Sequence, residues 1–222
     1  MSITKLFGPA LLALPLALSA CDRPQEEMAT NDEEAMAEAP AMTYTATYNE
    51  DGSLNRIDGW REWVFIGNPT TPNGLNGGEA PFPESHAVYI DPESWAHWKA
   101  TGEFREGTII AKELSMLYSE GGANEDGSTD QVSGRGFFQG GEFSGLEYAI
   151  KDSVQNADEP GYWAYYSSGH APGIAYPDTF ERQPAESCNS CHEFNAGDDW
   201  VFAQFYPVLA AAKGGQAEAD SE

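Results

Sequence analysis

Several short stretches of the chain alternate apolar and polar residues with a period of two, which is typical of half-buried β-strands. The clearest stretch runs from Thr108 to Tyr118. Its alternation places Lys112 on one face of the strand, among apolar side chains, and Glu113 on the opposite face. Turn-forming residues bound further segments in which we also expect strands: 86–90, 136–151 and 162–167.

Helix signals are few. Asp91-Pro92-Glu93 supplies an N-cap, a proline at the first helical position and an early acid, and Gly102 supplies a stop. Asp198-Asp199 predicts the start of a second helix, kinked at Pro207. Strands therefore outnumber short helices, and the sequence predicts an α+β fold with a largely antiparallel β-sheet and a few short helices.

The N-terminus has the pattern of an export signal. Lys5 precedes an apolar run, 6–18, that is too short to span a bilayer, so residues 1–20 are expected to be a signal peptide. Leu18-Ser19-Ala20-Cys21 resembles the bacterial lipoprotein box, in which the cysteine is lipidated. We expect a protein on the periplasmic side of a bacterial membrane, held there by a lipid on Cys21 and not by a membrane span. The alternative is ordinary cleavage after Ala20, which would leave a soluble periplasmic protein.

Composition divides the remainder into three parts. Residues 21–42 are acidic, contain no aromatic residue and are expected to form a solvated tether. Residues 43–212 carry the aromatic residues and have the size of a single domain, and 213–222 are expected to be a disordered tail. The formal net charge of −25 argues against nucleic acid as a partner and is compatible with a basic electron-acceptor protein.

Cys188-Asn189-Ser190-Cys191-His192 carries the clearest chemistry. C-x-x-C-H is the attachment motif of a c-type haem: two thiols bond the haem covalently, and the histidine that follows ligates its iron. A zinc site would need two more ligands, and Cys21 is the only other cysteine. A redox dithiol would need no adjacent histidine. We therefore predict covalent haem c, bound by Cys188 and Cys191, with His192 as the iron ligand, in a single haem domain.

The position of the motif excludes the commonest haem proteins. Small electron-carrying cytochromes c place the motif near the N-terminus and use a downstream methionine, but here no methionine follows it. Helical-bundle cytochromes c-prime need four long amphipathic helices, which this pattern lacks. The far side of the iron is therefore expected to be open. An electron carrier remains an alternative if His86 or Met116 supplies a sixth ligand.

Lys112 has two interpretations. A lysine in an apolar strand row either extends its ammonium to the edge of the sheet or lies in a dry pocket. In a dry pocket, desolvation would favour its neutral, nucleophilic form.

An ordered series of short fragments from about Trp60 to Leu209 resembles the cytochrome P-460 family. The motif C-x-x-C-H lies at the same place in both. The fragments, in chain order, are Trp60-Arg61-Glu62-Trp63-Val64, Gly67 with Thr71-Pro72-Asn73, Val88-Tyr89-Ile90-Asp91-Pro92-Glu93-Ser94, Gly107-Thr108, Lys112-Glu113-Leu114, Gly145-Leu146-Glu147, Glu159-Pro160-Gly161 with Trp163-Ala164, and Phe205-Tyr206-Pro207-Val208-Leu209.

This resemblance implies a dimeric periplasmic haem protein that oxidises hydroxylamine, chiefly to nitrous oxide, or that handles nitric oxide. It implies that Lys112 bonds covalently to the porphyrin edge and that His192 is the proximal iron ligand. It also implies that Glu147 lies near the open side of the haem, where it is a candidate proton acceptor. The alternative for Glu147 is an ordinary solvated acid on a strand.

His86 departs from the family pattern, which has an arginine at this position in well-known hydroxylamine oxidisers. A histidine can still donate hydrogen bonds over the iron, but it can also be neutral or ligate the metal. His97 and His170 are expected to be surface residues.

We therefore predict a haem enzyme that oxidises hydroxylamine and passes electrons to an external acceptor protein. The alternatives are a non-enzymatic nitric oxide-binding protein similar to the β-sheet cytochromes c-prime, which generally lack the lysine–haem bond, and a mono-haem electron carrier.

Overall fold

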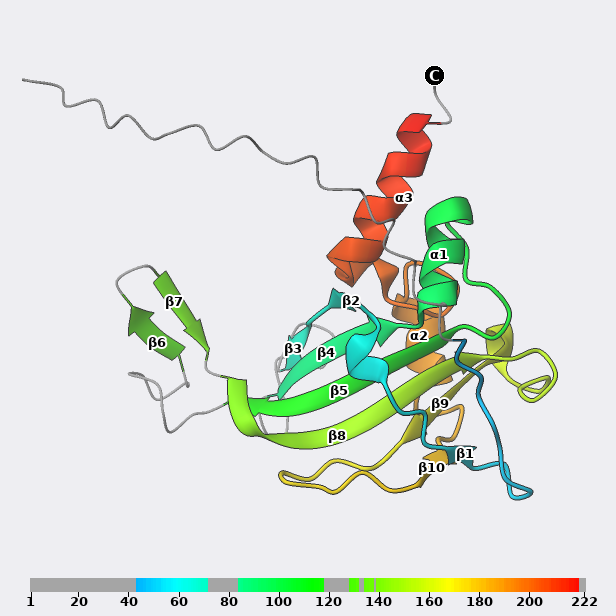
Figure 1. Ribbon diagram of the computed structural model, residues 1–222, viewed down its shortest axis with the longest axis horizontal. Coiled ribbons are helices and arrows are strands. Elements are labelled where there is room, and N and C mark those ends of the chain that lie inside the picture. Colours follow the sequence, from blue (N-terminus) through cyan, green and yellow to red (C-terminus); the bar gives the residue numbers. More distant parts are fainter. Residues whose placement is uncertain (1–42, 72–83, 118–127, 132–133, 138, 220–222) are drawn as a thin grey trace, which may run out of the picture. The chain divides into compact units, whose positions relative to one another are not determined.

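The computed structural model describes residues 43–71, 84–117, 128–131, 134–137 and 139–219 (Figure 1). These residues all belong to one structural unit, which begins at Pro40. The predicted signal peptide, the predicted lipidation site Cys21 and the acidic tether lie outside the described residues.

The described residues form an eight-stranded antiparallel sheet with short helices, which confirms the predicted α+β fold. Seven strands follow one another across the sheet in the order β1 (Leu54–Asn55), β10 (Thr179–Arg182), β9 (Trp163–Ser167), β8 (Gln139–Lys151), β5 (Ile109–Leu117), β4 (Glu84–Ile90) and β2 (Val64–Gly67), and β3 (Thr70–Thr71) also pairs with β4. A separate hairpin consists of β6 (Ser128–Gln131) and β7 (Gly134–Phe137). The helices are α1 (Pro92–Thr101), α2 (Asn189–Asn195) and α3 (Pro207–Ala219), with 3-10 turns at Trp60–Glu62, Pro160–Tyr162 and Ala203–Phe205.

Strand β5 lies between β4 and β8 and has a core on each of its faces. Ile109 and Ala111 pack in a cluster with Leu146 and Tyr148 on one face, and Ile110 packs in a second cluster on the other. The period of two places Lys112 on the Ile110 face, as predicted. Both faces of the sheet are thus covered, and the second one carries the site described below.

Helix α1 forms where its capping residues predict it. Asp91 accepts a hydrogen bond from the Ser94 backbone N–H at 2.9 Å, and Gly102 ends the helix with a φ of 72°. Helix α1 packs against α3, side by side with it in Figure 1. Trp98, which is fully buried, joins the two helices by donating its indole N–H to the Leu209 carbonyl at 3.1 Å.

The prediction that a helix starts at Asp198 is wrong. Asp198 and Val201 instead form a β-bridge, and the following residues form a 3-10 turn. Helix α3 begins at Pro207. Proline is well tolerated there, because a backbone N–H at the first helical position would have no hydrogen-bond partner within the helix. It continues to Ala219, past residue 213, where we expected the tail to begin. Among the described residues no helix is both long enough and apolar enough to cross a membrane.

Candidate functional site

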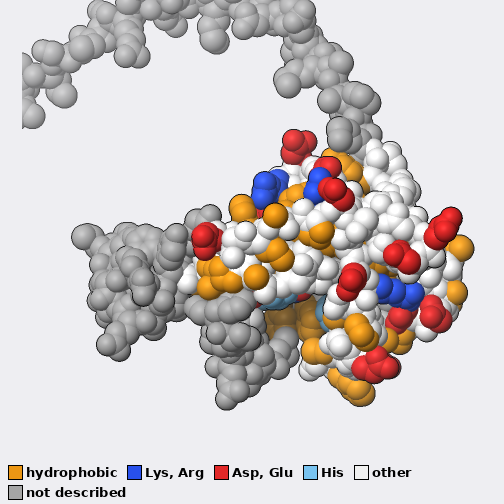
Figure 2. Space-filling view, turned by 90° about the horizontal axis from the view of Figure 1, so that it is seen from below, with side chains coloured by type: hydrophobic (Ala, Val, Ile, Leu, Met, Phe, Trp, Pro, Cys, Tyr) orange, Lys and Arg blue, Asp and Glu red, His pale blue; other side chains and the backbone are white. Residues whose placement is uncertain are grey.

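A cavity of about 780 Å³ lies between one face of the sheet and the segments that follow β10. This volume falls within the range of about 300–1,000 Å³ typical of cofactor and ligand pockets. Figure 2 shows a hollow on the lower face of the molecule, where histidine side chains meet hydrophobic ones. The lining residues come from the strands and from the C-terminal segments: Pro69, Thr70, His86, Val88, Ile110, Lys112, Glu147, Tyr148, Ala149, Tyr165, Tyr166, Ser167, Gln183, Cys188, His192, Phe202, Phe205 and Tyr206.

Helix α2 brings the C-x-x-C-H motif to this cavity. Cys188 is the N-cap residue of α2, and Cys191 and His192 follow within the helix. Residues three and four apart share one helix face, so the spacing groups the three side chains. Cys188 and His192 line the cavity, whereas Cys191 is exposed beside it and is not a lining residue. The Asn189 side chain anchors the helix by donating to the Trp163 carbonyl at 2.8 Å.

His192 is held in a fixed orientation. Its Nδ1 lies 2.7 Å from the Trp200 carbonyl oxygen, and its ring packs between Tyr165 and Phe202 at centroid distances of 4.3 and 4.6 Å. Burial lowers the pKa of His192 to about 4, against the opposing effect of the Trp200 hydrogen bond. A neutral imidazole whose Nδ1–H donates to a carbonyl leaves Nε2 free as a metal ligand.

The carbonyl that orients His192 belongs to a strained turn. Asp199 and Trp200 have φ angles of 39° and 58°, a region that residues with side chains rarely adopt. Trp200 O also accepts a hydrogen bond from the Tyr165 hydroxyl at 3.0 Å. Lys151 Nζ lies 2.6 Å from Asp199 Oδ2, which ties the turn to the end of β8. Such strain persists where surrounding contacts hold it, and here it serves to aim one carbonyl.

Lys112 and Glu147 are paired neighbours on β5 and β8 and form an ion pair in the cavity wall. Burial acts to lower the pKa of Lys112, but the charge of Glu147 and the hydrogen bond with it outweigh burial and raise that pKa. These opposing effects favour the ammonium form of Lys112, whereas desolvation alone would favour the neutral form. Burial likewise acts to raise the pKa of Glu147, but Lys112 and a hydrogen bond from His170 lower it overall.

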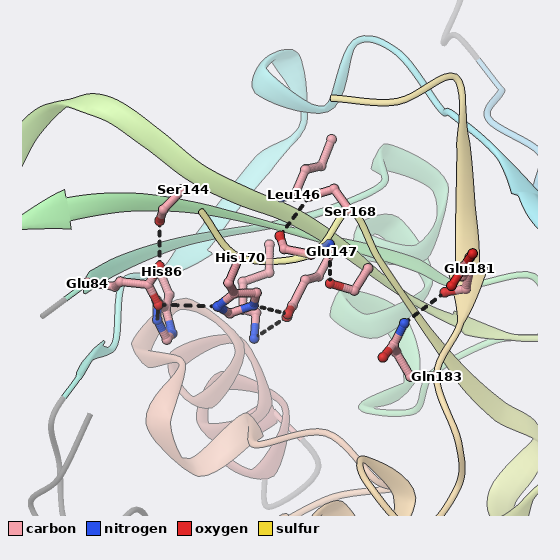
Figure 3. A network of polar contacts seen from close by, with 12 residues as sticks. Glu84, His86, Ser144, Leu146, Glu147, Ser168, His170, Glu181 and Gln183 are labelled. Atoms are coloured by element: carbon pink, nitrogen blue, oxygen red, sulfur yellow. Dashed lines mark hydrogen bonds and ion pairs between the residues drawn. The ribbon is translucent and has the colours of Figure 1, made fainter. Parts of the chain in front are cut away.

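A second histidine joins Glu147 to a buried acid, as Figure 3 shows. His170 Nε2 lies 2.7 Å from Glu147 Oε1, and His170 Nδ1 lies 3.6 Å from Glu84 Oε2. Glu84 is only 5% exposed and accepts a hydrogen bond from the Ser144 hydroxyl at 2.5 Å. His86 Nε2 lies 3.5 Å from Glu84 Oε2 and, within the described part of the chain, is buried without a closer hydrogen-bond partner. Burial lowers the pKa of His86, so its ring is neutral.

The segment that carries His170 lies directly against β8. Backbone N–H groups of Ser168 and Ala171 donate to the carbonyls of Leu146 and Ser144 at 3.0 and 2.9 Å. A side chain at Gly145 would place its Cβ 2.9 Å from the Gly169 carbonyl oxygen. Glycine at this position therefore permits the close approach that brings His170 to Glu147.

Comparison with protein families identifies the family of this chain. The family model for cytochrome P460 matches residues 57–203, more than half of the chain. The chain belongs to the cytochrome P460 family. No curated protein matches it. Cytochrome P460 proteins bind haem, and the cavity residues fit one: an apolar slot, a neutral imidazole oriented by its Nδ1–H, and a thiol at its edge.

The structure thus brings together in one cavity Glu147, His86, Lys112, Cys188 and His192, all of which the sequence singled out. Met116, the other candidate sixth ligand, is not a lining residue. His170 is a surface residue, as predicted, with 40% of its side chain exposed, but it also contacts both acids of the site. No sequence pattern singles out Glu84. Neither residue has a sequence signal, since both depend on how a loop crosses β8.

Proposed function

We propose that this member of the cytochrome P460 family is a c-type haem enzyme that oxidises hydroxylamine and passes the electrons to an external acceptor protein. The observation that carries the proposal is the pairing of an amine, Lys112, with a carboxylate, Glu147, in the wall of the cavity that His192 enters. A nitric oxide-binding protein needs an imidazole and an apolar slot, but it has no use for a base beside a potential porphyrin-linking amine.

The haem would be held at four points. Cys188 and Cys191 would bond to its edge through thioethers, His192 Nε2 would ligate the iron, and Lys112 would bond to the macrocycle. When bound, the haem supplies an iron that accepts electrons from the substrate and releases them to the acceptor.

Glu147 has two uses in this proposal. An ammonium cannot act as a nucleophile, so Lys112 would have to lose a proton before it bonds to the macrocycle, and Glu147 is in contact to receive it. Replacing a porphyrin C–H bond by this C–N bond also removes two electrons and two further protons, so the link would need a two-electron oxidant such as a peroxide. During turnover, hydroxylamine loses protons together with electrons. Glu147 is the carboxylate on the cavity wall that is placed to accept those protons.

With haem bound in the cavity, the surrounding residues would reduce the access of water to the site. Val88, Ile110 and Phe202 line the cavity, and Tyr206, which is 8% exposed, lines it from the turn before α3. In a dry site, charges and hydrogen bonds act more strongly on a small polar substrate than they do in water. The neutral ring of His86 would offer such a substrate one hydrogen bond.

We further propose that the protein lies on the periplasmic side of a bacterial membrane, anchored by a lipid on Cys21, and that it forms a homodimer. Its formal charge of −25 suits a basic electron-acceptor protein. The supporting observations are the signal-like N-terminus and the lipoprotein box.

Mass analysis of proteolytic peptides tests the covalent part of the proposal. Wild-type protein should yield haem bound to both the Cys188–Cys191 peptide and the Lys112 peptide. Lys112→Ala should lose the second link and the oxidation of hydroxylamine, and it should still bind nitric oxide. The control Lys99→Ala, on the exposed side of α1, should keep both the Lys112 link and the oxidation of hydroxylamine. Haem that acid acetone extracts from the wild type would contradict thioether attachment. A wild type without the Lys112 link and without hydroxylamine oxidation would favour the nitric oxide-binding alternative.

A further inference from the structure

His170 occupies a position between the cavity and solvent. Its side chain is 40% exposed, yet each of its ring nitrogens faces a carboxylate: Nε2 faces Glu147 and Nδ1 faces Glu84. Those two acids are much less exposed, at 23% and 6% of their side-chain surface. A histidine in this position can hold a proton on each nitrogen, and it can exchange one of them with a carboxylate or with water.

The backbone fixes His170 in this position. The segment around it is bonded to β8 at three points, from Ser168 to Leu146, from Ala171 to Ser144 and from Gly173 to Phe143, at 2.8 to 3.0 Å. Gly169 and Gly173 adopt φ angles of 82° and 74°, which allow the segment to turn at both sides of His170. The contact with Glu147 is therefore built into the fold.

We propose that His170 is the proton-exchange partner of Glu147, and that it carries protons released in the cavity to solvent. This inference rests on the proposed hydroxylamine oxidation, because that reaction releases the protons. Glu147 and Glu84 are the ionisable groups that face His170, and behind them lie Lys112 and His86 respectively.

The transfer conserves protons at each step. Glu147 takes a proton from the substrate and becomes neutral, which removes half of the negative charge that holds His170 as a cation. His170 then releases its Nε2 proton to water through its exposed edge and keeps the Nδ1 proton, which faces Glu84. The vacant Nε2 takes the proton of Glu147, which restores the starting state, so that one proton has moved from substrate to water.

The electrostatics of the pair agree with this role. The hydrogen bond with Glu147 and the nearby carboxylate of Glu84 outweigh burial and raise the pKa of His170 to about 9. His170 is therefore a cation at neutral pH. Bonding of Lys112 to the porphyrin would consume the ammonium that now pairs with Glu147, and His170 would then be the cation that keeps Glu147 ionised.

His170→Gln tests the proposal, because glutamine can hydrogen-bond to Glu147 but cannot exchange a proton. With hydroxylamine as substrate, kcat should fall by roughly ten- to a hundredfold, KM should change less than about twofold, and the solvent deuterium isotope effect on kcat should increase. His97→Gln, a histidine of α1 away from the cavity, should behave as wild type.

A second readout does not depend on turnover. Long-range proton–nitrogen NMR of the ferrous carbonyl protein, whose iron is diamagnetic, should show the His170 ring titrating near pH 9. Titration near the ordinary histidine pKa of about 6.5 would overturn the proposal. If the wild type oxidises hydroxylamine and His170→Gln does so with the same kcat, the relay is refuted and the proposed function stands. If the wild type does not oxidise hydroxylamine, the proposed function itself is refuted.

Discussion

The strained turn that orients His192 makes a quantitative prediction about a residue outside the cavity. Two consecutive residues with side chains and positive φ store on the order of 1–3 kcal/mol each. Part of the compensation comes from Lys151, whose Nζ lies 2.6 Å from Asp199 Oδ2 and 3.1 Å from the Phe104 carbonyl. Lys151→Met keeps the length of the side chain and removes both contacts.

The exposure of the pair sets the expected magnitude. An exposed ion pair contributes about 0–1 kcal/mol, and removing one partner of a fully buried pair costs about 3–5 kcal/mol. The Lys151 and Asp199 side chains are 19% and 29% exposed, so this pair is neither fully exposed nor fully buried. We therefore expect Lys151→Met to lower the free energy of unfolding by about 1–2 kcal/mol and to shift the iron–histidine stretching band of the ferrous protein.

Guanidinium unfolding followed by far-ultraviolet circular dichroism measures the first effect, and resonance Raman spectroscopy measures the second. Lys213→Met is the matched control, because Lys213 pairs with Asp198 next to the same turn but the pair is 47% and 33% exposed. It should cost less than about 1 kcal/mol and leave the Raman band in place. Equal losses of stability in the two variants, with neither band shifted, would refute the idea that Lys151 holds the turn.

Three further predictions concern other parts of the chain. Gly145→Ala should lower the free energy of unfolding by roughly 1–3 kcal/mol in chemical denaturation and reduce hydroxylamine turnover, because its Cβ would lie 2.9 Å from the Gly169 carbonyl; full activity would contradict the close approach. Arg61→Met should lower the free energy of unfolding by about 2 kcal/mol in the same assay, because it leaves the Glu113 carboxylate, which is 4% exposed, without its cation. An unchanged denaturation midpoint would contradict this. Cys21→Ser should move the protein from the membrane fraction to the soluble fraction or block its processing, and unchanged partitioning would contradict lipidation.

The local patterns predicted much of the fold because they report local physics. The alternation over 108–118 predicted β5 within one residue at each end, and the cap at Asp91 with the stop at Gly102 predicted α1. The same alternation placed Lys112 on the correct face. These features depend on the chain's own periodicity and need no knowledge of distant neighbours.

The remainder of the site depends on contacts between segments far apart in the chain. His170 is exposed, as predicted, but its contact with Glu147 comes from a loop that crosses β8 at Gly145, which no local pattern indicates. The ionised state of Lys112 comes from Glu147 on the adjacent strand, a pairing that the register of β5 and β8 determines. Asp198-Asp199 predicts a helix cap but forms a turn, because an aspartate serves equally well in both settings.

Hydroxylamine turnover tests the central claim most directly. Purified, haem-loaded protein is mixed anaerobically with excess hydroxylamine and a one-electron acceptor, and acceptor reduction and nitrous oxide are followed together. The proposed function predicts that wild-type protein reduces the acceptor and forms nitrous oxide, and that Lys112→Ala and Glu147→Gln do neither. A wild type that binds nitric oxide yet neither reduces the acceptor nor forms nitrous oxide would contradict it.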